Sequence, residues 1–168
     1  MISVEEARKN ILKEIRAVGT EVISLQAAAG RVLAENVRSR RTQPPADLSA
    51  MDGFAVKAAD LGTIPASLKI VGEVPAGGSY DNTVGTGEAV RIFTGAALPS
   101  GTDTIIIQED TEFDAETVTV KEGAAKGTYV RPAGLDFSAG DIGIKAPTIL
   151  TPRDIGLLAA MDIPWITV

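Results

Sequence analysis

The chain contains no cysteine and no histidine among its 168 residues. Without cysteine it forms neither disulfides nor thiolate metal ligands, which agrees with a reducing compartment. Without histidine, the sequence excludes a Ser-His-Asp triad, a histidine base and the usual zinc ligands. Any chemistry must therefore use carboxylates, hydroxyls, amines or backbone groups.

Aromatic residues and long apolar runs are also scarce. Only 4% of residues are aromatic, so the core must be built from Val, Ile, Leu and Ala. No apolar stretch approaches the roughly 20 residues of a membrane-spanning helix. The first residues include early acids and lack the apolar segment of a signal peptide. We therefore expect a cytoplasmic protein.

The charge balance is acidic, with 22 Asp and Glu against 16 Lys and Arg and a net charge of −6. This excess argues against non-specific nucleic-acid binding, which needs clustered basic residues. With 45% hydrophobic and 23% charged residues, the composition is that of a globular protein. The length suits one domain or two small ones.

The N-terminal segment predicts a helix over residues 4–18. Ser3 and Glu6 have the spacing of a capping box, in which each side chain bonds the other's backbone amide. Gly19 is a stop signal. Apolar residues follow at helical spacing: Ala7, Ile11, Ile15 and Val18.

The middle of the chain predicts a β-rich fold, because short apolar runs alternate with glycine and proline turns. An irregular loop is expected at 42–49, where two prolines lie among polar residues. Strands are expected at 21–24, 31–38, 53–56, 68–74, 89–92, 104–107, 117–121 and 129–131.

A second helix is predicted near the end, opening with Thr151 as N-cap and Pro152 at the first helical position. Pro164 should end it, and a final strand is expected at 165–168. Because the sequence stops inside that strand, we expect the natural chain to continue past Val168.

The first candidate site segment is PPADLSAMDGFAV, residues 44–56. Asp52 lies where a proline-stiffened loop enters a strand, so its carboxylate could meet a ligand or metal. Gly53 makes Asp-Gly a turn dipeptide, because glycine accepts positive φ. The alternative is that Asp52 only bonds its own backbone in an Asx-turn.

The second segment is RIFTGAALPSGTD, residues 91–103. Thr94 offers a hydroxyl, and the amides near Gly95 could form an anion-binding nest. It is not a P-loop, because the GxxxxGK[ST] lysine is missing. The alternative is an ordinary glycine- and proline-rich loop.

Two further segments carry charges at strand ends. Glu109 follows the apolar run 105–107, where low dielectric could raise its pKa, or it could be a solvated strand end. Arg131 could clamp a phosphate or carboxylate, and Asp136 could coordinate Mg²⁺. A surface salt bridge and a turn acceptor are the alternatives for these two residues.

Carboxylates, a threonine and an arginine on glycine-rich loops suit a phosphate-bearing ligand with a hard cation. Spacing alone does not bring them together. Three segments, however, resemble in order the N-terminal half of the MoeA/gephyrin family of molybdopterin molybdenumtransferases: PPADLSAMDGFAV, GEAVRIFTGAALPSGTDTIIIQED and VRPAGLDFSAGDIGIKAPTILTPRDIGLLAA. The resemblance spans nearly the whole chain.

The resemblance implies the last step of molybdenum cofactor synthesis. Molybdenum from molybdate is inserted into adenylylated molybdopterin and AMP is released, with Mg²⁺ or a similar divalent ion. The protein would mainly position and stabilise a pyrophosphate. Because the ligand supplies the sulfur, a chain without cysteine or histidine agrees with this chemistry.

Residue by residue, the resemblance assigns catalytic roles to Asp52, Thr94 and Asp136. The two aspartates would place the metal or phosphate, and Thr94 would donate a hydrogen bond. The family commonly has glutamate where this chain has Leu135. The assignment of Asp136 is unaffected, but this chain has no pair of adjacent acidic residues at that position. The second-rank, cofactor-binding candidates are Ser49, Gly95, Arg131 and Glu109.

The family architecture implies a mainly β fold of coiled, bifurcated sheets in two lobes. The N-terminal helix at 1–20 precedes the two lobes, which are a β-rich linker lobe at 21–41 with 141–168 and an inserted β-rich lobe at 42–140 that carries the site loops. The family's molybdopterin-binding α/β domain and its C-terminal domain are not in this sequence. The family's site lies between that α/β domain and the β-rich domain of a dimer partner.

We therefore expect this chain to hold one wall of a site and to be inactive alone. The alternative is a non-catalytic assembly module, since gephyrin-like relatives also organise partners. The third hypothesis is a small β domain that binds no nucleotide. The three family-like motifs, which occur in the family's order, argue against it.

Overall fold

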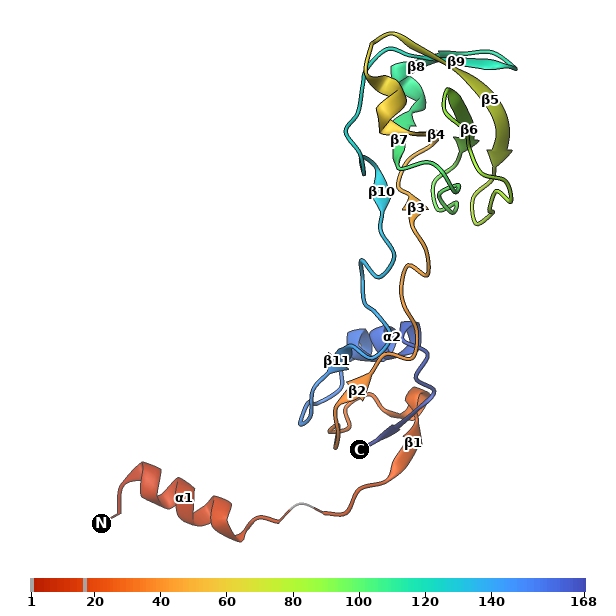
Figure 1. Ribbon diagram of the computed structural model, residues 1–168. Helices are drawn as coiled ribbons and strands as arrows, with labels where there is room; N and C mark the ends of the chain where they lie inside the picture. Colours follow the sequence, from red (N-terminus) through yellow and green to blue (C-terminus); the bar gives the residue numbers. More distant parts are fainter. Residues whose placement is uncertain (1, 17) are drawn as a thin grey trace. The chain divides into compact units, whose positions relative to one another are not determined.

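A computed structural model describes residues 2–16 and 18–168 (Figure 1). The chain divides into two compact units. Unit 1 comprises the residues up to Arg40 together with Ile142–Val168, and unit 2 is Arg41–Asp141. Within the described residues, no helix is long and apolar enough to cross a membrane.

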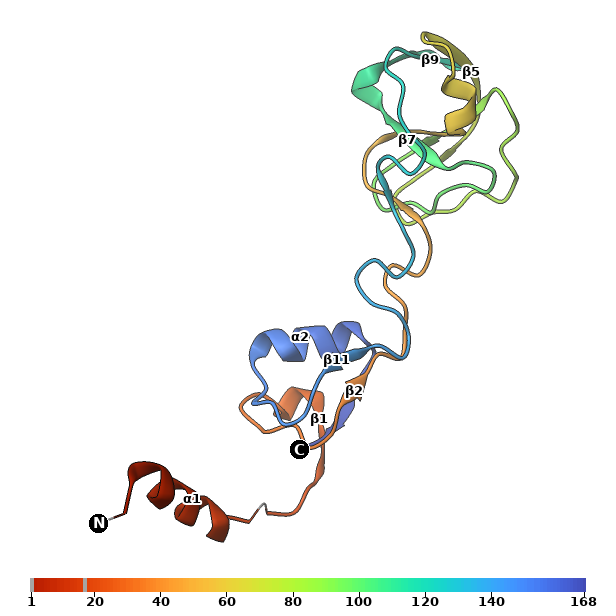
Figure 2. The same cartoon turned by 60° about the vertical axis from the view of Figure 1, so that its left-hand side comes forward.

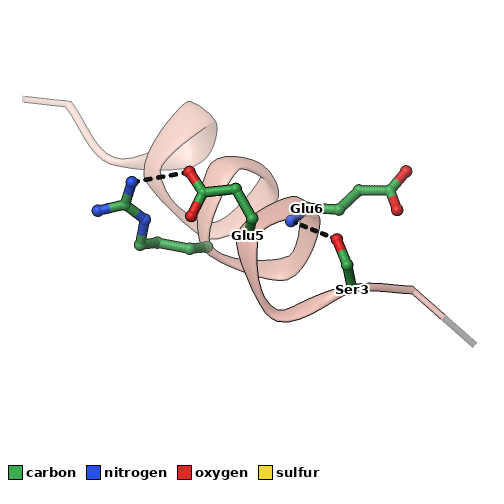
Figure 3. Close-up of polar contacts among 4 residues, drawn as sticks. Ser3, Glu5 and Glu6 are labelled. Atoms are coloured by element: carbon green, nitrogen blue, oxygen red, sulfur yellow. Dashed lines mark hydrogen bonds and ion pairs between the residues drawn. The ribbon is translucent and has the colours of Figure 1, made fainter.

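Helix α1, Val4–Glu14, begins where the sequence predicts a cap. The Ser3 hydroxyl accepts a hydrogen bond from the Glu6 amide at 3.1 Å, and Glu5 pairs with Arg8 at 2.8 Å (Figure 3). Figure 3 shows the Glu6 carboxylate pointing away from Ser3, so only one half of the predicted capping box forms.

The end of α1 differs from the prediction. The helix stops at Glu14 and Ile15 is already extended, whereas the apolar spacing predicted a helix to residue 18. Ala17 in that range lies outside the described residues. None of the residues of α1 is buried, and a short helix without tertiary packing is only marginally stable.

Two strand pairs and helix α2 build the rest of unit 1. Strand β1, Val22–Ser24, pairs with β12, Trp165–Thr167, and β2, Val37–Arg38, pairs with β11, Ile142–Ile144, both antiparallel. A 3₁₀ turn, η1 (Leu25–Ala27), follows β1. The strand predicted over 31–38 is therefore reduced to its last two residues, preceded by an isolated bridge at Val32.

Helix α2, Pro152–Ala160, has a complete capping box. The Thr151 hydroxyl accepts from the Asp154 amide, and the Asp154 carboxylate accepts from the Thr151 amide at 2.7 Å. The Thr151 amide and the Thr151 hydroxyl both donate to the Asp154 carboxylate, which favours its charged form and lowers the pKa of Asp154. Leu158 on the inner face is fully buried, which anchors the helix.

Unit 2 is built on a six-stranded sheet in the order β7-β4-β6-β5-β9-β8, which curls around itself (Figure 2). Only β5 and β6 are parallel. The strands are β4 Gly53–Val56, β5 Ala66–Val74, β6 Glu88–Ile92, β7 Thr104–Ile107, β8 Thr111–Phe113 and β9 Thr117–Val120.

Three short elements complete unit 2. Strand β3, Leu48–Ser49, pairs with β10, Val130–Arg131. The 3₁₀ turn η2, Ala58–Leu61, follows β4, and η3, Gln108–Asp110, follows β7.

Both faces of the curled sheet are apolar. Phe54 and Val56 of β4 point into one cluster and Ala55 into the other, as expected for side chains that alternate along a strand. The first cluster also contains Leu61, Ala66, Leu68, Ala89, Ile106, Val118 and Val120, and the second Val74, Val84, Val90, Ile92, Ala96 and Ile105. The predicted mainly β fold with an aliphatic core is confirmed.

Gly53 is required for a different reason from the one the sequence suggested. It is not among the glycines with positive φ, and it lies inside β4 rather than in a turn. A Cβ atom at this position would overlap the backbone carbonyl oxygen of Ile106 on the neighbouring strand β7. The close approach of two backbones explains the glycine.

We expect Gly53→Ala to lower the free energy of unfolding by about 2 kcal/mol or more, because two paired strands must move apart. Urea unfolding of the two proteins measures the difference. Gly156→Ala on α2, where a Cβ meets nothing within 4 Å, is the matched control and should be neutral or slightly stabilising. Equal effects of the two substitutions would contradict this account.

We expect Thr151→Ala to cost about 1 kcal/mol, because the Asp154 amide loses its acceptor and the Asp154 carboxylate loses the hydrogen bond from the Thr151 hydroxyl. Thermal unfolding followed by circular dichroism measures the loss. Thr151→Ser keeps the hydroxyl and should retain the wild-type stability; if serine were as damaging as alanine, the cap would not be the cause.

Candidate functional site

Four strands of unit 2 place their ends at one edge of the sheet. The parallel strands β5 and β6 both finish there, since Val74 is in register with Ile92. Strand β4 starts there, because Gly53 faces Ile92 of β6 on one side and Ile107 of β7 on the other. The residues just outside these ends are therefore neighbours although they are far apart in sequence.

Asp52 and Thr94 meet at this edge. Oδ1 of Asp52 accepts hydrogen bonds from the Thr94 amide at 2.8 Å and the Thr94 hydroxyl at 2.7 Å. The amide, the hydroxyl and then the positive charge of Arg91 lower the pKa of Asp52, so the carboxylate is ionised at neutral pH. Oδ2 accepts no hydrogen bond from the part of the chain that the structure describes.

A shallow cavity of about 510 Å³ opens beside this pair. Its apolar wall comes from Pro75 and Ala76 after β5 and from Phe93 after β6, and its polar part is Asp52 with Thr94. The cavity thus offers a fixed negative charge and a hydroxyl next to apolar surface. This arrangement can orient a polar ligand.

Arg91 is a functional candidate that the sequence analysis missed. Its guanidinium carbon lies 4.6 Å from the ring centre of Phe113, 5.3 Å from that of Phe93 and 6.0 Å from that of Phe54. The Glu73 carboxylate is 3.8 Å away. In the sequence, Arg91 could have been recognised as the single charged residue within the apolar run AVRIF of a predicted core strand.

Gly95 and Ser49 shape the turn that carries Thr94. The Gly95 amide donates to the Ser49 carbonyl at 2.9 Å, and the Ala96 amide donates to the Phe93 carbonyl at 3.0 Å. Gly95 has a φ of 82°, a conformation that favours glycine. Since the amides of residues 94–96 all donate within the chain, the expected anion nest has no free donor in this arrangement.

Arg131 and Asp136 form an ion pair at 3.2 Å, in which both side chains are 44% exposed. This is the surface salt bridge that the sequence left open as an alternative. Among the described residues, no hydrogen bond or ion pair joins it directly to Asp52 or Thr94. The Arg131–Asp136 pair and the Asp52–Thr94 pair are connected through the backbone. Ser49 lies opposite Val130, the neighbour of Arg131, and its carbonyl accepts from the amide of Gly95, the neighbour of Thr94.

Glu109 lies in η3, just after β7, and its side chain is exposed. The preceding Gln108 amide donates to the Asp52 carbonyl at 3.2 Å, which places this turn at the same edge of the sheet. Exposure agrees with the solvated alternative for Glu109. The structure therefore brings Glu109 to the edge but not into contact with the Asp52–Thr94 pair.

The acidic residues do not gather into a metal site. In the described parts of the chain, no group of three or more acidic residues could hold an ion. Asp52 is bound to Thr94 and Asp136 is paired with Arg131. The residues present thus do not form a resident Mg²⁺ site by themselves.

We expect Thr94→Val to raise the pKa of Asp52, because the valine removes one of the two donors to its carboxylate. Ionised Asp52 stabilises the fold above its unfolded pKa of about 3.9, and this stabilisation is lost as pH falls through the lower folded pKa. The variant should therefore lose stability relative to wild type at neutral pH, and this loss should become smaller at low pH, where Asp52 is protonated.

Carbon-13 NMR of the Asp52 carboxyl, followed through a pH titration, measures the shift. Thr102→Val is the matched control, because the Thr102 hydroxyl bonds the Pro99 carbonyl instead. If both valine variants moved the Asp52 pKa equally, the hydroxyl contact would not be responsible.

The chain is similar to proteins of known family along almost its whole length. Residues 2–161 match the model of the MoeA N-terminal region, domains I and II. A molybdopterin molybdenumtransferase of Nostoc sp. is 40% identical over 153 residues, with 89% of this chain and 35% of the relative covered. One from Haemophilus influenzae is 35% identical, with 97% and 41% covered.

Solved structures support the same family. The crystal structure of a molybdopterin biosynthesis MoeA protein from Pyrococcus horikoshii OT3 matches with a TM-score of 0.91 and 33% identity, covering 98% of this chain and 45% of that chain. The sequence given thus spans about two fifths of the length of the curated relatives described above. The chain belongs to the MoeA family, of which it forms the N-terminal region.

Proposed function

We propose that this chain is part of a molybdopterin molybdenumtransferase. The whole protein would insert molybdenum from molybdate into adenylylated molybdopterin and release AMP in molybdenum cofactor biosynthesis. Relatives that carry the name molybdopterin molybdenumtransferase support the proposal. The observation that carries it is the Asp52–Thr94 pair at the edge of the curled sheet.

The three residues proposed as catalytic would act by position and charge. Asp52 keeps a negative charge at neutral pH and leaves Oδ2 for the ligand, while Thr94 fixes the carboxylate. Asp136 would act together with Arg131, whose guanidinium can contact a phosphate as well as its carboxylate partner. Ser49, Gly95 and Glu109 are proposed to shape and flank the ligand site.

Magnesium, the expected divalent ion, would have to bind with the substrate. Mg²⁺ commonly uses one or two carboxylates together with substrate phosphates. Asp52 and Asp136 provide separate single carboxylates, each already in contact with another side chain. We therefore assign no ion to this chain and derive no step through one.

The proposed site needs a second wall. The cavity at Asp52 is shallow, and substrate sites usually enclose most of a small ligand. We propose that further domains and a second subunit of a homodimer close it, that these 168 residues are inactive alone, and that the protein works in the cytoplasm.

One observation favours a second candidate, a non-catalytic assembly module. Ile11 and Leu12 of α1 are 65% and 56% exposed, and no residue of the helix is buried. An exposed apolar helix face suits contact with another protein. The transferase candidate requires the edge of the sheet that carries Asp52 and Thr94 for molybdenum insertion. The assembly module does not require it.

We expect Asp52→Asn to reduce molybdenum insertion on the order of 100-fold, the loss typical of removing one fixed electrostatic group. The measurement uses the H. influenzae relative with its matching N-terminal region replaced by residues 1–168. Molybdate-dependent AMP release from adenylylated molybdopterin is followed.

Asp81→Asn is the matched control, since Asp81 is an exposed carboxylate of unit 2 that is not among the residues lining the cavity at Asp52. It should retain full activity. An inactive wild-type chimaera that still folds and associates would favour the assembly module, and an active Asp52→Asn variant would remove Asp52 from the proposed site.

A further inference from the structure

Segment 47–49 lies between two groups of proposed site residues. On one side, the Leu98 amide donates to the Asp47 carbonyl at 2.8 Å, and the Ser49 amide donates to the Ala96 carbonyl at 2.9 Å. These bonds hold the turn that follows Thr94. On the other side, β3 pairs with β10, which leads to the Arg131–Asp136 pair.

The loop after β10 is held by the residues just before β3. The Gly134 amide donates to the Pro44 carbonyl at 2.9 Å, and the Asp136 amide donates to the Gln43 carbonyl at 3.0 Å. The Ala133 amide donates to Oδ1 of Asp47 at 2.8 Å. Of these three contacts, only the last uses a side chain, so it can be removed by substitution.

We propose that Asp47 is a positioning residue that fixes the Arg131–Asp136 loop relative to the edge carrying Asp52 and Thr94. Its carbonyl oxygen holds the loop after Thr94, and its carboxylate holds the loop between Arg131 and Asp136. The same residue thus sets the spacing of both groups. It acts through the residues it holds and need not touch a ligand itself.

The acceptor oxygen, rather than the negative charge, carries this role. Asparagine retains a carbonyl oxygen that can accept from the Ala133 amide, whereas alanine retains no acceptor. Asp60 supplies a matched control in the same unit. Its Oδ2 accepts from the Gly87 amide at 2.8 Å, a bond of the same kind and length outside the proposed site.

The first test is amide hydrogen exchange by NMR on the 168-residue chain. Asp47→Ala should speed exchange at Ala133 about tenfold, while Asp47→Asn and Asp60→Ala leave it near the wild-type rate. Unchanged exchange at Ala133 in Asp47→Ala would overturn the proposal. So would a loss of protection throughout unit 2, because the residue would then support the fold in general.

The second test is turnover in the chimaera, and this part rests on the proposed function. Asp47→Ala should lower kcat about tenfold, Asp47→Asn should restore it, and Asp60→Ala should leave it unchanged. Failure of asparagine to rescue would show that the charge matters and would overturn the acceptor role. An inactive wild-type chimaera counts against the proposed function alone, since exchange at Ala133 still decides whether Asp47 holds the loop.

Discussion

The backbone contact between β4 and its neighbours is the constraint on which the candidate site depends. Strand β4 is hydrogen-bonded to β6 on one side and β7 on the other, and Gly53 allows the Ile106 carbonyl to approach. Asp52 immediately precedes this glycine. Its position relative to Thr94 is therefore set by the register of central strands rather than by a flexible loop, which suits a group that must be held in place before a ligand arrives.

The edge of the sheet carries the negative charge of Asp52, with the positive charge of Arg91 close by. Asp52 keeps its carboxylate ionised through two donors from Thr94, and Arg91 adds a positive charge close by. The three phenylalanine rings around Arg91 attract its guanidinium through their π faces while excluding part of the solvent. Arg91 also forms an ion pair with Glu73 at 3.8 Å, in which the Glu73 side chain is 60% exposed.

The sequence predicted those parts of the fold in which several neighbouring residues carry the same signal. Strands 53–56 and 104–107 were found with their observed bounds, since each is an apolar run closed by a turn signal. Strands β3, β8 and β11 were missed. Strand β3 lies in the segment 42–49, where two prolines predicted an irregular loop. Turn chemistry singled out Asp52 and Thr94 separately, but their contact spans 42 residues and follows from strand register, which no local pattern contains.

Unit 2 is inserted into unit 1, and its two ends are paired. Gln43 bridges Phe137, and the Ala139 amide donates to the Thr42 hydroxyl at 3.2 Å. Strands β2 and β11 of unit 1 lie just outside this bridge on either side in the sequence. Once unit 2 has folded, the loop that remains to be closed between them is roughly ten times shorter, which lowers the entropic cost of pairing them by about 2 kcal/mol. The connectivity thereby makes the pairing of β2 with β11 less costly once the inserted unit has folded.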